Sequence, residues 1–210
     1  METLDHTKKN DLKIILLGES GVGKTNLINV VMGKQFEQNT LSSQSGSYFE
    51  GSYDSKELGK SYVYNLWDTA GQEVYRSLNK IFINGSKIVM VVYAINNKKS
   101  FEEVDYWINY VRDILGNGND YILALIANKS DLYEEDQVVN DDEGENKAHN
   151  YNIKFKVTSA LTDAAGFKLF LHELIDDYIK LVGPEGEKLL YSTSLKITAQ
   201  NTKKGKKKCC

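Results

Sequence analysis

Cysteine and proline are almost absent from this sequence, and their positions exclude several classes of protein. The two cysteines, Cys209 and Cys210, are the last two residues, so no disulfide framework can hold the fold, because adjacent cysteines cannot join distant segments. The chain also lacks a long apolar run. The opening stretch, METLDHTKKN, has no apolar core, so we expect neither a signal peptide nor a membrane span there. Glu2 further excludes N-myristoylation, which requires a glycine at that position.

An excess of positive charge is lacking as well. The 210 residues carry a formal net charge of −3 at pH 7, and 41% of them are hydrophobic, which argues against a nucleic-acid-binding protein and against a disordered chain. The length suits one domain. Residues 133–145 carry seven acids, whereas the last ten residues, NTKKGKKKCC, carry five lysines and no acid. We expect the acidic run to form a solvated loop and the first turn of a helix, where carboxylates are favourable.

Short apolar runs alternate with helical patterns along the chain. This alternation predicts the α/β class, with a mostly parallel sheet of six strands. A 3.6-residue period predicts helices at residues 24–32, 100–115 and 165–182, which should cover both faces of the sheet. The second and third strands are close enough in sequence to form a hairpin, which would add one antiparallel edge strand. The apolar runs place the strands at residues 12–17, 48–53, 61–67, 87–93, 121–127 and 154–158.

The last helical pattern ends at the only proline, Pro184, which follows Gly183. Beyond this point the chain is polar and loses its period, so we expect residues 183–210 to form a flexible tether. Residues 1–10 are expected to be a flexible N-terminus. The folded domain is therefore predicted to span residues 11–182.

One glycine-rich segment carries a specific chemical signal. Gly18–Thr25 reads GESGVGKT and fits the pattern G-x-x-x-x-G-K-[ST], directly after a predicted strand and directly before a predicted helix. Glycines allow successive backbone N–H groups to point at one anion, and the helix N-terminus adds its positive end. Lys24 can reach the β- and γ-phosphates, and the Thr25 hydroxyl can bind Mg²⁺. The motif indicates a nucleoside triphosphate and leaves the base open.

A second motif bears on the base. Asn128-Lys129-Ser130-Asp131 lies at the carboxyl end of a predicted strand, on the edge where α/β sheets bind ligands. A carboxylate at Asp131 can accept hydrogen bonds from the N1–H and the exocyclic amine of guanine, a pattern that adenine cannot supply. Thr158-Ser159-Ala160 follows the next strand and offers backbone N–H groups to the base oxygen.

A third motif, Trp67-Asp68-Thr69-Ala70-Gly71-Gln72-Glu73, lies at the end of the second hairpin strand. Asp68 can hold Mg²⁺ through water, and the Gly71 N–H can contact the γ-phosphate. Gln72 can orient the attacking water. Together the three motifs indicate an enzyme that hydrolyses GTP.

The order GESGVGKT, WDTAGQE, NKSD, TSA resembles the Ras-like small GTPases over residues 11–182, and within them the Rab family. Rab-like features are Trp67 before DTAGQE, Val92-Tyr93 with Ser100-Phe101, and the final Cys-Cys. The resemblance implies a P-loop NTPase fold, with residues 11–182 as the GTP-binding domain. It implies a protein that binds GTP and GDP with Mg²⁺, hydrolyses GTP slowly, and acts as a membrane-recruited switch in vesicle trafficking.

The resemblance also assigns roles to residues. Gln72 is the catalytic residue, and Mg²⁺ is held by Thr25, Ser43 and, through water, Asp68. Phe36 matches the aromatic that packs against guanine, although a core phenylalanine closing the preceding helix is the alternative. The nucleotide contacts implied are Ser20, Gly21, Val22, Gly23, Lys24, Thr25, Asn26, Phe36, Ser43, Gly71, Asn128, Lys129, Asp131, Ser159, Ala160 and Leu161.

Three departures from the family pattern stand out. The first-switch stretch T-[IL]-G-x-x-F is absent, and counting along the chain puts Ser43 at the Mg²⁺-binding threonine, with Thr40 as the competing assignment. Leu161 stands where the family usually has lysine. The segment after Gln72 also differs, so partner recognition there is the least transferable property. The unusual first switch motivates an alternative function: a pseudo-GTPase that binds nucleotide with little turnover.

The tail, KKGKKKCC, resembles the double-cysteine signal that Rab proteins use for two geranylgeranyl groups, on Cys209 and Cys210. The resemblance implies an exchange factor, a GTPase-activating protein, effectors, a GDP-dissociation inhibitor and a prenylation escort protein as partners. We expect a monomer on the cytoplasmic face of an endomembrane, cycling with the cytosol, and no nucleic-acid partner. Which compartment and which regulators it uses stays open. Trp67 and Trp107 are expected in the core.

Overall fold

The computed structural model describes residues 12–38, 47–69, 76–116, 120–133 and 136–201 of the chain. Within these ranges, residues 47, 76–79, 188–189 and 191–201 are described by their backbone alone. Strands and helices alternate along the chain, as the sequence patterns predict.

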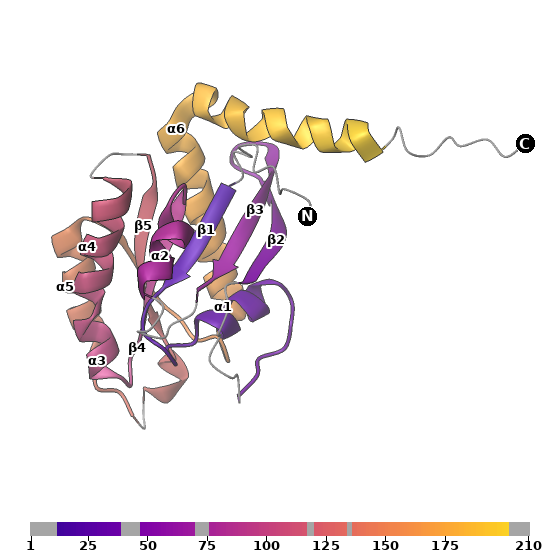
Figure 1. Cartoon of the computed structure of the whole chain (residues 1–210). Helices are drawn as coiled ribbons and strands as arrows, with labels where there is room; N and C mark the ends of the chain where they lie inside the picture. Colours follow the sequence, from indigo (N-terminus) through magenta and orange to yellow (C-terminus); the bar gives the residue numbers. More distant parts are fainter. Residues whose placement is uncertain (1–11, 39–46, 70–75, 117–119, 134–135, 202–210) are drawn as a thin grey trace, which may run out of the picture.

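A six-stranded sheet with the order β2-β3-β1-β4-β5-β6 forms the centre of the fold (Figure 1). β2 at one edge pairs antiparallel with β3, and the other neighbouring pairs are parallel, so the prediction of one antiparallel edge strand is confirmed. The chain order reverses at β1, which lies between β3 and β4. The strands are β1 (Leu12–Leu17), β2 (Ser47–Ser55), β3 (Lys60–Asp68), β4 (Ile88–Ala94), β5 (Ile122–Asn128) and β6 (Lys154–Val157).

Helices cover both faces of the sheet (Figure 1). One face packs against α1 and α6, and the other against α3, α4 and α5. The helices are α1 (Lys24–Val31), α2 (Arg76–Ile83), α3 (Lys98–Glu102), α4 (Val104–Leu115), α5 (Asp141–Tyr151) and α6 (Ala164–Asn201), with a 3₁₀ turn η2 (Ser130–Leu132).

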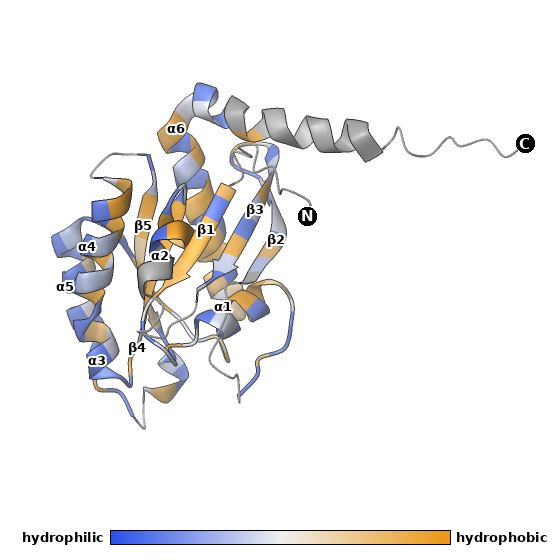
Figure 2. Cartoon of the chain, viewed as in Figure 1, coloured by the Kyte–Doolittle hydropathy of each residue, from blue (hydrophilic) through white to orange (hydrophobic). Residues whose placement is uncertain are grey.

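The side chains of the apolar strands contribute to two hydrophobic clusters, one on each face of the sheet. In β1, Ile14 and Leu16 face the α1–α6 side, whereas Ile15 and Leu17 face the side of α4 and α5. Every residue of β4 is buried, and Figure 2 shows the central strands as mostly hydrophobic. Strands covered on both faces need continuous apolar runs, which explains why these strands were recognisable in the sequence.

The helices before α5 differ from the sequence prediction in two places. The single helix expected at residues 100–115 is two helices, α3 and α4, which meet at Glu103. Asn97 caps the start of α3 by accepting a hydrogen bond from the Ser100 N–H. α2 was not predicted at all. The acidic run does begin a helix, as expected: Asp141, Asp142 and Glu143 form the first turn of α5.

The last helix is longer than predicted. We expected it to end near residue 182, and Gly183 does interrupt it, with φ 64° and ψ −172°. Beyond Gly183 and Pro184 the chain is again helical to Asn201. Gly183 supplies the positive φ of the break, and Pro184 is favourable in a first helical turn. That residues 183–210 form a flexible tether stays a prediction.

The second part of α6 contacts the end of the β2–β3 hairpin. The Glu187 carboxylate accepts hydrogen bonds from Lys60 Nζ at 2.7 Å and from the Tyr62 hydroxyl at 2.8 Å. Leu58 and Leu190 both pack against the α1–α6 cluster. The chain beyond Gly183 thus begins in contact with the domain.

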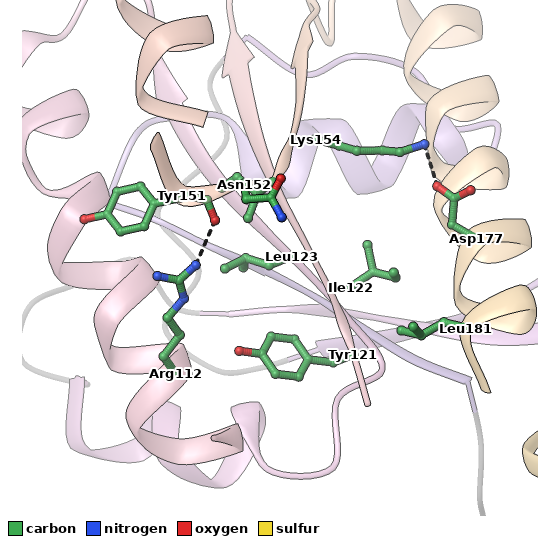
Figure 3. Close-up of a pocket in the computed structure, with 10 residues that line it drawn as sticks. Arg112, Tyr121, Ile122, Leu123, Tyr151, Asn152, Lys154, Asp177 and Leu181 are labelled. Carbon is green, nitrogen blue, oxygen red and sulfur yellow. Dashed lines mark hydrogen bonds and ion pairs between the residues drawn. The ribbon is translucent and has the colours of Figure 1, made fainter. Parts of the chain in front are cut away.

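A hollow of about 630 Å³ lies where β5 and β6 begin (Figure 3). Arg112, at one side of it, donates to the Tyr151 carbonyl at 2.9 Å, and Lys154 pairs with Asp177 at 2.5 Å on the other side. Parallel strands begin at the edge opposite to their carboxyl ends, so this hollow is on the far side of the sheet from the motifs that the sequence singled out.

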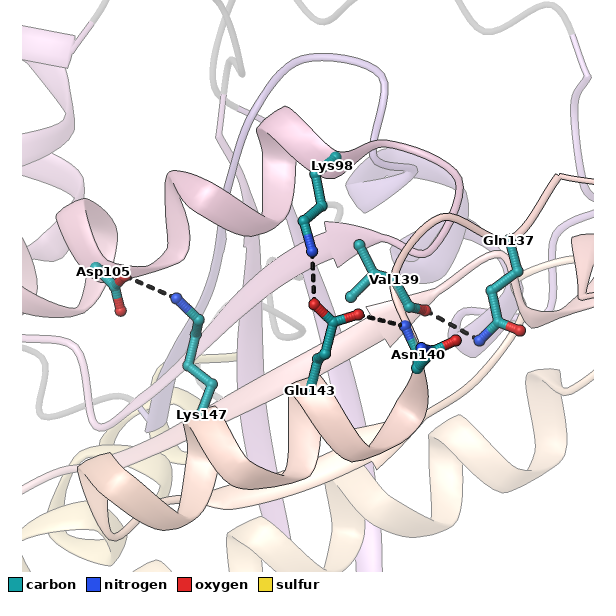
Figure 4. Close-up of polar contacts among 7 residues, drawn as sticks. All are labelled: Lys98, Asp105, Gln137, Val139, Asn140, Glu143 and Lys147. Atoms are coloured by element: carbon teal, nitrogen blue, oxygen red, sulfur yellow. Dashed lines mark hydrogen bonds and ion pairs between the residues drawn. The ribbon is translucent and has the colours of Figure 1, made fainter.

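α5 is joined to α3 and α4 by polar contacts (Figure 4). Lys98 pairs with Glu143 at 2.5 Å, and Lys147 pairs with Asp105 at 2.7 Å. Glu143 also accepts a hydrogen bond from the Asn140 N–H at 2.9 Å, which caps the start of the helix. Exposed ion pairs contribute little stability each, so their main effect is to fix the orientation of α5.

Candidate functional site

The three sequence motifs meet at the carboxyl ends of the parallel strands. The glycine-rich loop follows β1, Asp68 ends β3, and Asn128 ends β5. Ser159 lies just beyond β6. Because β1 is the strand at which the chain order reverses, this edge holds the crevice in which open α/β sheets bind ligands.

The loop between β1 and α1 has the backbone of an anion cradle. Gly18, Gly21 and Gly23 all have positive φ, at 140°, 78° and 97°. A Cβ at Gly18 would lie 2.1 Å from the Val92 carbonyl oxygen, so this position requires glycine for space as well as for conformation. No side chain caps the first turn of α1, so its backbone N–H groups can face a ligand.

Lys24 lies inside this loop and is only 5% exposed. Its ammonium donates to the carbonyl oxygens of Gly18 and Glu19, both at 2.8 Å. Burial lowers the pKa of Lys24 to about 8, against the smaller opposite influence of the Asp68 and Glu19 carboxylates. A desolvated cation at the centre of an anion cradle attracts phosphate strongly.

A hydroxyl from α1 and a carboxylate from the end of β3 meet beside the loop. Thr25 Oγ1 donates to Asp68 Oδ2 at 2.8 Å, and Asp68 is 2% exposed. Oxygen donors of this kind are the ligands that Mg²⁺ prefers, in sites that also use substrate phosphates. The residues present therefore fit a Mg²⁺–nucleotide complex, with Thr25 as a direct ligand and Asp68 beside it.

Asn128 joins the two halves of the site. Its side chain is 1% exposed, and Nδ2 donates to the Val22 carbonyl at 2.8 Å. Its Oδ1 accepts from the Ala160 N–H at 3.2 Å. The amide thus ties the glycine-rich loop to the loop after β6, and a Cβ at Gly23 would lie 2.4 Å from its nitrogen.

The loops after β5 and β6 are also joined directly. Ser159 Oγ donates to Asp131 Oδ1 at 2.5 Å and accepts from the Leu161 N–H at 3.0 Å. Lys129, which has φ 70°, turns the chain sharply into η2. The sequence predicts that backbone N–H groups of Thr158-Ser159-Ala160 face a base oxygen, and Leu161 is a further predicted contact. In this structure those of Ala160 and Leu161 donate to protein oxygens instead.

Two residues near the expected base position are on the surface. Phe36 is 36% exposed, so the alternative of a core phenylalanine is wrong, and its ring is accessible to a ligand. Leu161 is 53% exposed. Ser20 and Gly21, at the tip of the glycine-rich loop, are exposed too.

Several predicted site residues lie outside the described ranges. These are Ser43 and its competitor Thr40, then Gly71 and Gln72, and the two cysteines Cys209 and Cys210. Their assignments stay predictions.

The sequence did not reveal an aromatic surface beside the site. Trp67 was expected in the core, but it is only partly buried and packs against the hydrophobic cluster on the face of α3, α4 and α5. Its ring stacks on Tyr48, with 5.4 Å between the ring centroids, and its centroid lies 5.9 Å from that of Phe82. Lys13 Nζ lies over the Trp67 ring, 5.0 Å from the centroid. Tyr48 is 61% exposed. The hairpin register, which puts Tyr48 opposite Trp67, could have indicated this aromatic surface. Trp107, in contrast, is buried as expected.

The sheet order, the glycine-rich loop with its buried lysine, and the Thr25–Asp68 pair define an α/β P-loop nucleotide-binding protein. The family model described as the Ras family matches residues 13–179, so the chain belongs to the Ras family. It is a small GTPase in the general sense of that family, whose members bind guanine nucleotides with Mg²⁺ and act as switches under the control of regulators.

Proposed function

We propose that this chain is a Rab-like small GTPase that hydrolyses GTP slowly and acts as a membrane-recruited switch in intracellular vesicle trafficking. The observation that carries the enzymatic part is the Thr25–Asp68 hydrogen bond of 2.8 Å beside the buried Lys24. It brings a Mg²⁺-binding hydroxyl, a carboxylate and a phosphate-binding cation to one place. The Rab-like part rests on sequence features: Trp67 before DTAGQE and the final Cys209–Cys210.

Each residue has a separate task in this proposal. Lys24 has one N–H donor beyond those on the Gly18 and Glu19 carbonyls, and binds the β- and γ-phosphates. Thr25, Ser43 and, through water, Asp68 would hold Mg²⁺, which would neutralise charge on the phosphates. Asp131 selects guanine by accepting from N1–H and the exocyclic amine. Gln72 orients the attacking water, and the Gly71 N–H contacts the γ-phosphate.

Hydrolysis by the chain alone should be slow. Of its two arginines, Arg112 lies beside the starts of β5 and β6, on the far edge of the sheet from the site, and the side chain of Arg76 is outside the described ranges. Among the described side chains no arginine lies at the site, and turnover without an activating partner should be on the order of 10⁻⁴ to 10⁻³ s⁻¹, as in Ras. This supports a GTPase-activating protein as a partner.

The aromatic surface of Tyr48, Trp67 and Phe82 suits an effector. It lies on β2, β3 and α2, the elements that flank the two predicted switch segments. Exposed aromatic side chains are frequent anchors of protein interfaces. Both segments join directly to these elements in the sequence, so we infer that a partner docked here distinguishes the GTP form from the GDP form.

Single-turnover hydrolysis tests the enzymatic proposal. Parent protein loaded with GTP should release phosphate slowly, and Gln72→Leu should bind GTP as tightly but hydrolyse it at least about tenfold more slowly, because the water is no longer oriented. Equal rates for parent and variant would remove Gln72 from the reaction.

The rival function, a pseudo-GTPase, is motivated by Ser43 in the first switch, and no measurable turnover by the parent protein would favour it. Ser43→Ala and Thr40→Ala serve as controls for one another: the substitution that selectively weakens the GTP–Mg²⁺ complex identifies the metal ligand.

A further inference from the structure

Asn26, the third residue of α1, is hydrogen-bonded to a segment that follows the helix. Its Nδ2 donates to the Glu37 carbonyl at 2.9 Å, and its Oδ1 accepts from the Glu37 N–H at 3.2 Å. The Asn26 side chain is 8% exposed. An amide that donates to and accepts from the same residue is fixed in orientation, and so is the backbone that it contacts.

The segment that Asn26 contacts has little burial to hold it. After α1 the chain reverses at Gly33, where φ is 77°, and residues 33–38 are all exposed. Its start is fixed by the Lys34 N–H, which donates to the Asn29 carbonyl at 2.9 Å, and by the Lys34 ammonium, 4.3 Å from the ring centroid of Phe49. The contacts to Asn26 fix it again at Glu37.

Phe36 lies between these two fixed points. Its ring is more than one-third exposed, although phenylalanine normally gains from burial. A ring that is held at the surface by its backbone can meet a flat ligand without first having to be ordered. Affinity gains from such preorganisation because the entropy cost is not incurred on binding.

We propose that the side chain of Asn26 is a positioning residue for the guanine nucleotide, which acts by holding Phe36 where it packs on the base. The inference rests on the proposed function and on the resemblance to Ras-like GTPases, which implies that guanine packs against Phe36. Asn26 contacts the protein through its amide, so its effect on the base is exerted through the backbone at Glu37.

The rate at which a fluorescent GDP leaves the full-length, Mg²⁺-loaded protein tests this. Asn26→Ala removes both hydrogen bonds and should speed release about tenfold. Asn26→Asp keeps the acceptor but puts a carboxylate oxygen beside the Glu37 carbonyl, so release should also be faster. Phe36→Ala should speed release at least as much. The decisive variant is the double substitution, in which Asn26→Ala should add little to Phe36→Ala.

Asn29→Ala is the matched control. Asn29 is also 8% exposed and lies on the same helix, and its contact to Lys34 uses the backbone carbonyl, which alanine retains. It should release GDP at the parent rate, even if it lowers stability. A purely structural role for Asn26 predicts additive effects in the double variant, and that result would overturn the inference while the proposed function stands. Failure of the parent to retain GDP would overturn both.

Hydrogen exchange gives a readout that is independent of the nucleotide. The Glu37 amide, which donates to Asn26, should exchange more slowly in parent protein and in Asn29→Ala than in Asn26→Ala. Equal exchange in all three would show that Asn26 does not hold the segment. This measurement decides the question even if Asn26→Ala binds nucleotide too weakly for a release rate.

Discussion

Asp131 illustrates how one side chain can determine the base. Ser159 Oγ donates to one of its oxygens at 2.5 Å, and an ionised carboxylate has lone pairs left for two further donors. Asp131→Asn should lower GTP affinity about a hundredfold, because hydrogen bonds to a charged group are worth about 1.5–3 kcal/mol each. Affinity for XTP should rise, since xanthine presents a carbonyl to the new amide donor.

Competition binding with GTP, XTP and ATP measures this change of preference. Asp136→Asn is the control, because Asp136 is an exposed aspartate in the same loop and should leave the preference unchanged. If Asp131→Asn still prefers GTP over XTP, Asp131 does not read the base.

Two glycines of the glycine-rich loop allow the cost of backbone strain to be measured apart from the cost of steric overlap. Gly18 and Gly21 both have positive φ, but a Cβ at Gly18 would overlap the Val92 carbonyl, whereas a Cβ at Gly21 would meet nothing within 4 Å. Gly21→Ala should cost only the left-handed conformation, about 1–2 kcal/mol. Gly18→Ala should cost clearly more, because β1 or β4 must move. Urea unfolding of the nucleotide-free proteins compares them, and equal losses would show that the Val92 carbonyl does not restrict this position.

For single residues, the sequence predicted the position of those that lie at a fixed spacing from a strand end or a helix start. Thr25 and Asp68 each lie next to a strand end or a helix start, so their meeting at one edge could be expected. Asn128 was assigned to the nucleotide, yet its amide ties Val22 to Ala160. Such a contact depends on how two distant loops pack, which no local pattern encodes.

The contact between α6 and the β2–β3 hairpin should make stability depend on pH. His172 stacks on Tyr53 with 3.9 Å between ring centroids, and the Tyr53 hydroxyl donates to Asp176 at 2.8 Å. Burial and, to a smaller extent, Lys168 lower the pKa of His172, while Asp176 opposes them. Because the folded-state pKa lies below the ordinary 6.5, the unfolded state binds more protons in that window. Stability should therefore fall as the pH drops through 6.5 towards the folded-state pKa.

Urea unfolding between pH 5 and pH 7.5 tests the sign. His172→Phe keeps a ring against Tyr53 and should lose part of this pH dependence, whereas His149→Phe, at an exposed histidine of α5, should retain the parent slope. If the stability of His172→Phe falls more steeply with decreasing pH than that of the parent, His172 is not the source of this pH dependence.

Among the elements, the strands were predictable because burial on both faces requires uninterrupted apolar residues, as in β4. Helix boundaries were less predictable from the sequence. The apolar stripe runs on from Phe101 to Leu115, so the break between α3 and α4 at Glu103 could not be recognised in it. The helix beyond Gly183 begins in a polar stretch without a period, and its contacts to Lys60 and Tyr62 come from the tertiary structure.

In the molecule as a whole, the proposed nucleotide site and the start of the C-terminal segment lie at opposite edges of the sheet. The glycine-rich loop follows the carboxyl end of β1, whereas Leu181, two residues before the break in α6, lines the hollow at the starts of β5 and β6. No helix among the described residues is long and apolar enough to cross a membrane. In our proposal, attachment depends on lipids on Cys209 and Cys210, which follow this segment in the sequence.

This separation predicts that the anchor can be removed without loss of hydrolysis. Replacing Cys209 and Cys210 together by serine keeps the length and the five lysines of the last ten residues. Single-turnover hydrolysis should be unchanged, because neither residue lies in the GTP-binding domain. The protein should nevertheless move from the membrane fraction to the cytosol.

Lysines alone contribute about 1 kcal/mol each near an anionic surface, and salt screens that attraction, whereas two lipid chains hold a protein stably. Fractionation of cells with a high-salt wash distinguishes the two. If the serine variant still sediments with membranes after the wash, the anchor lies elsewhere in the chain and the lipidation of the cysteine pair is wrong.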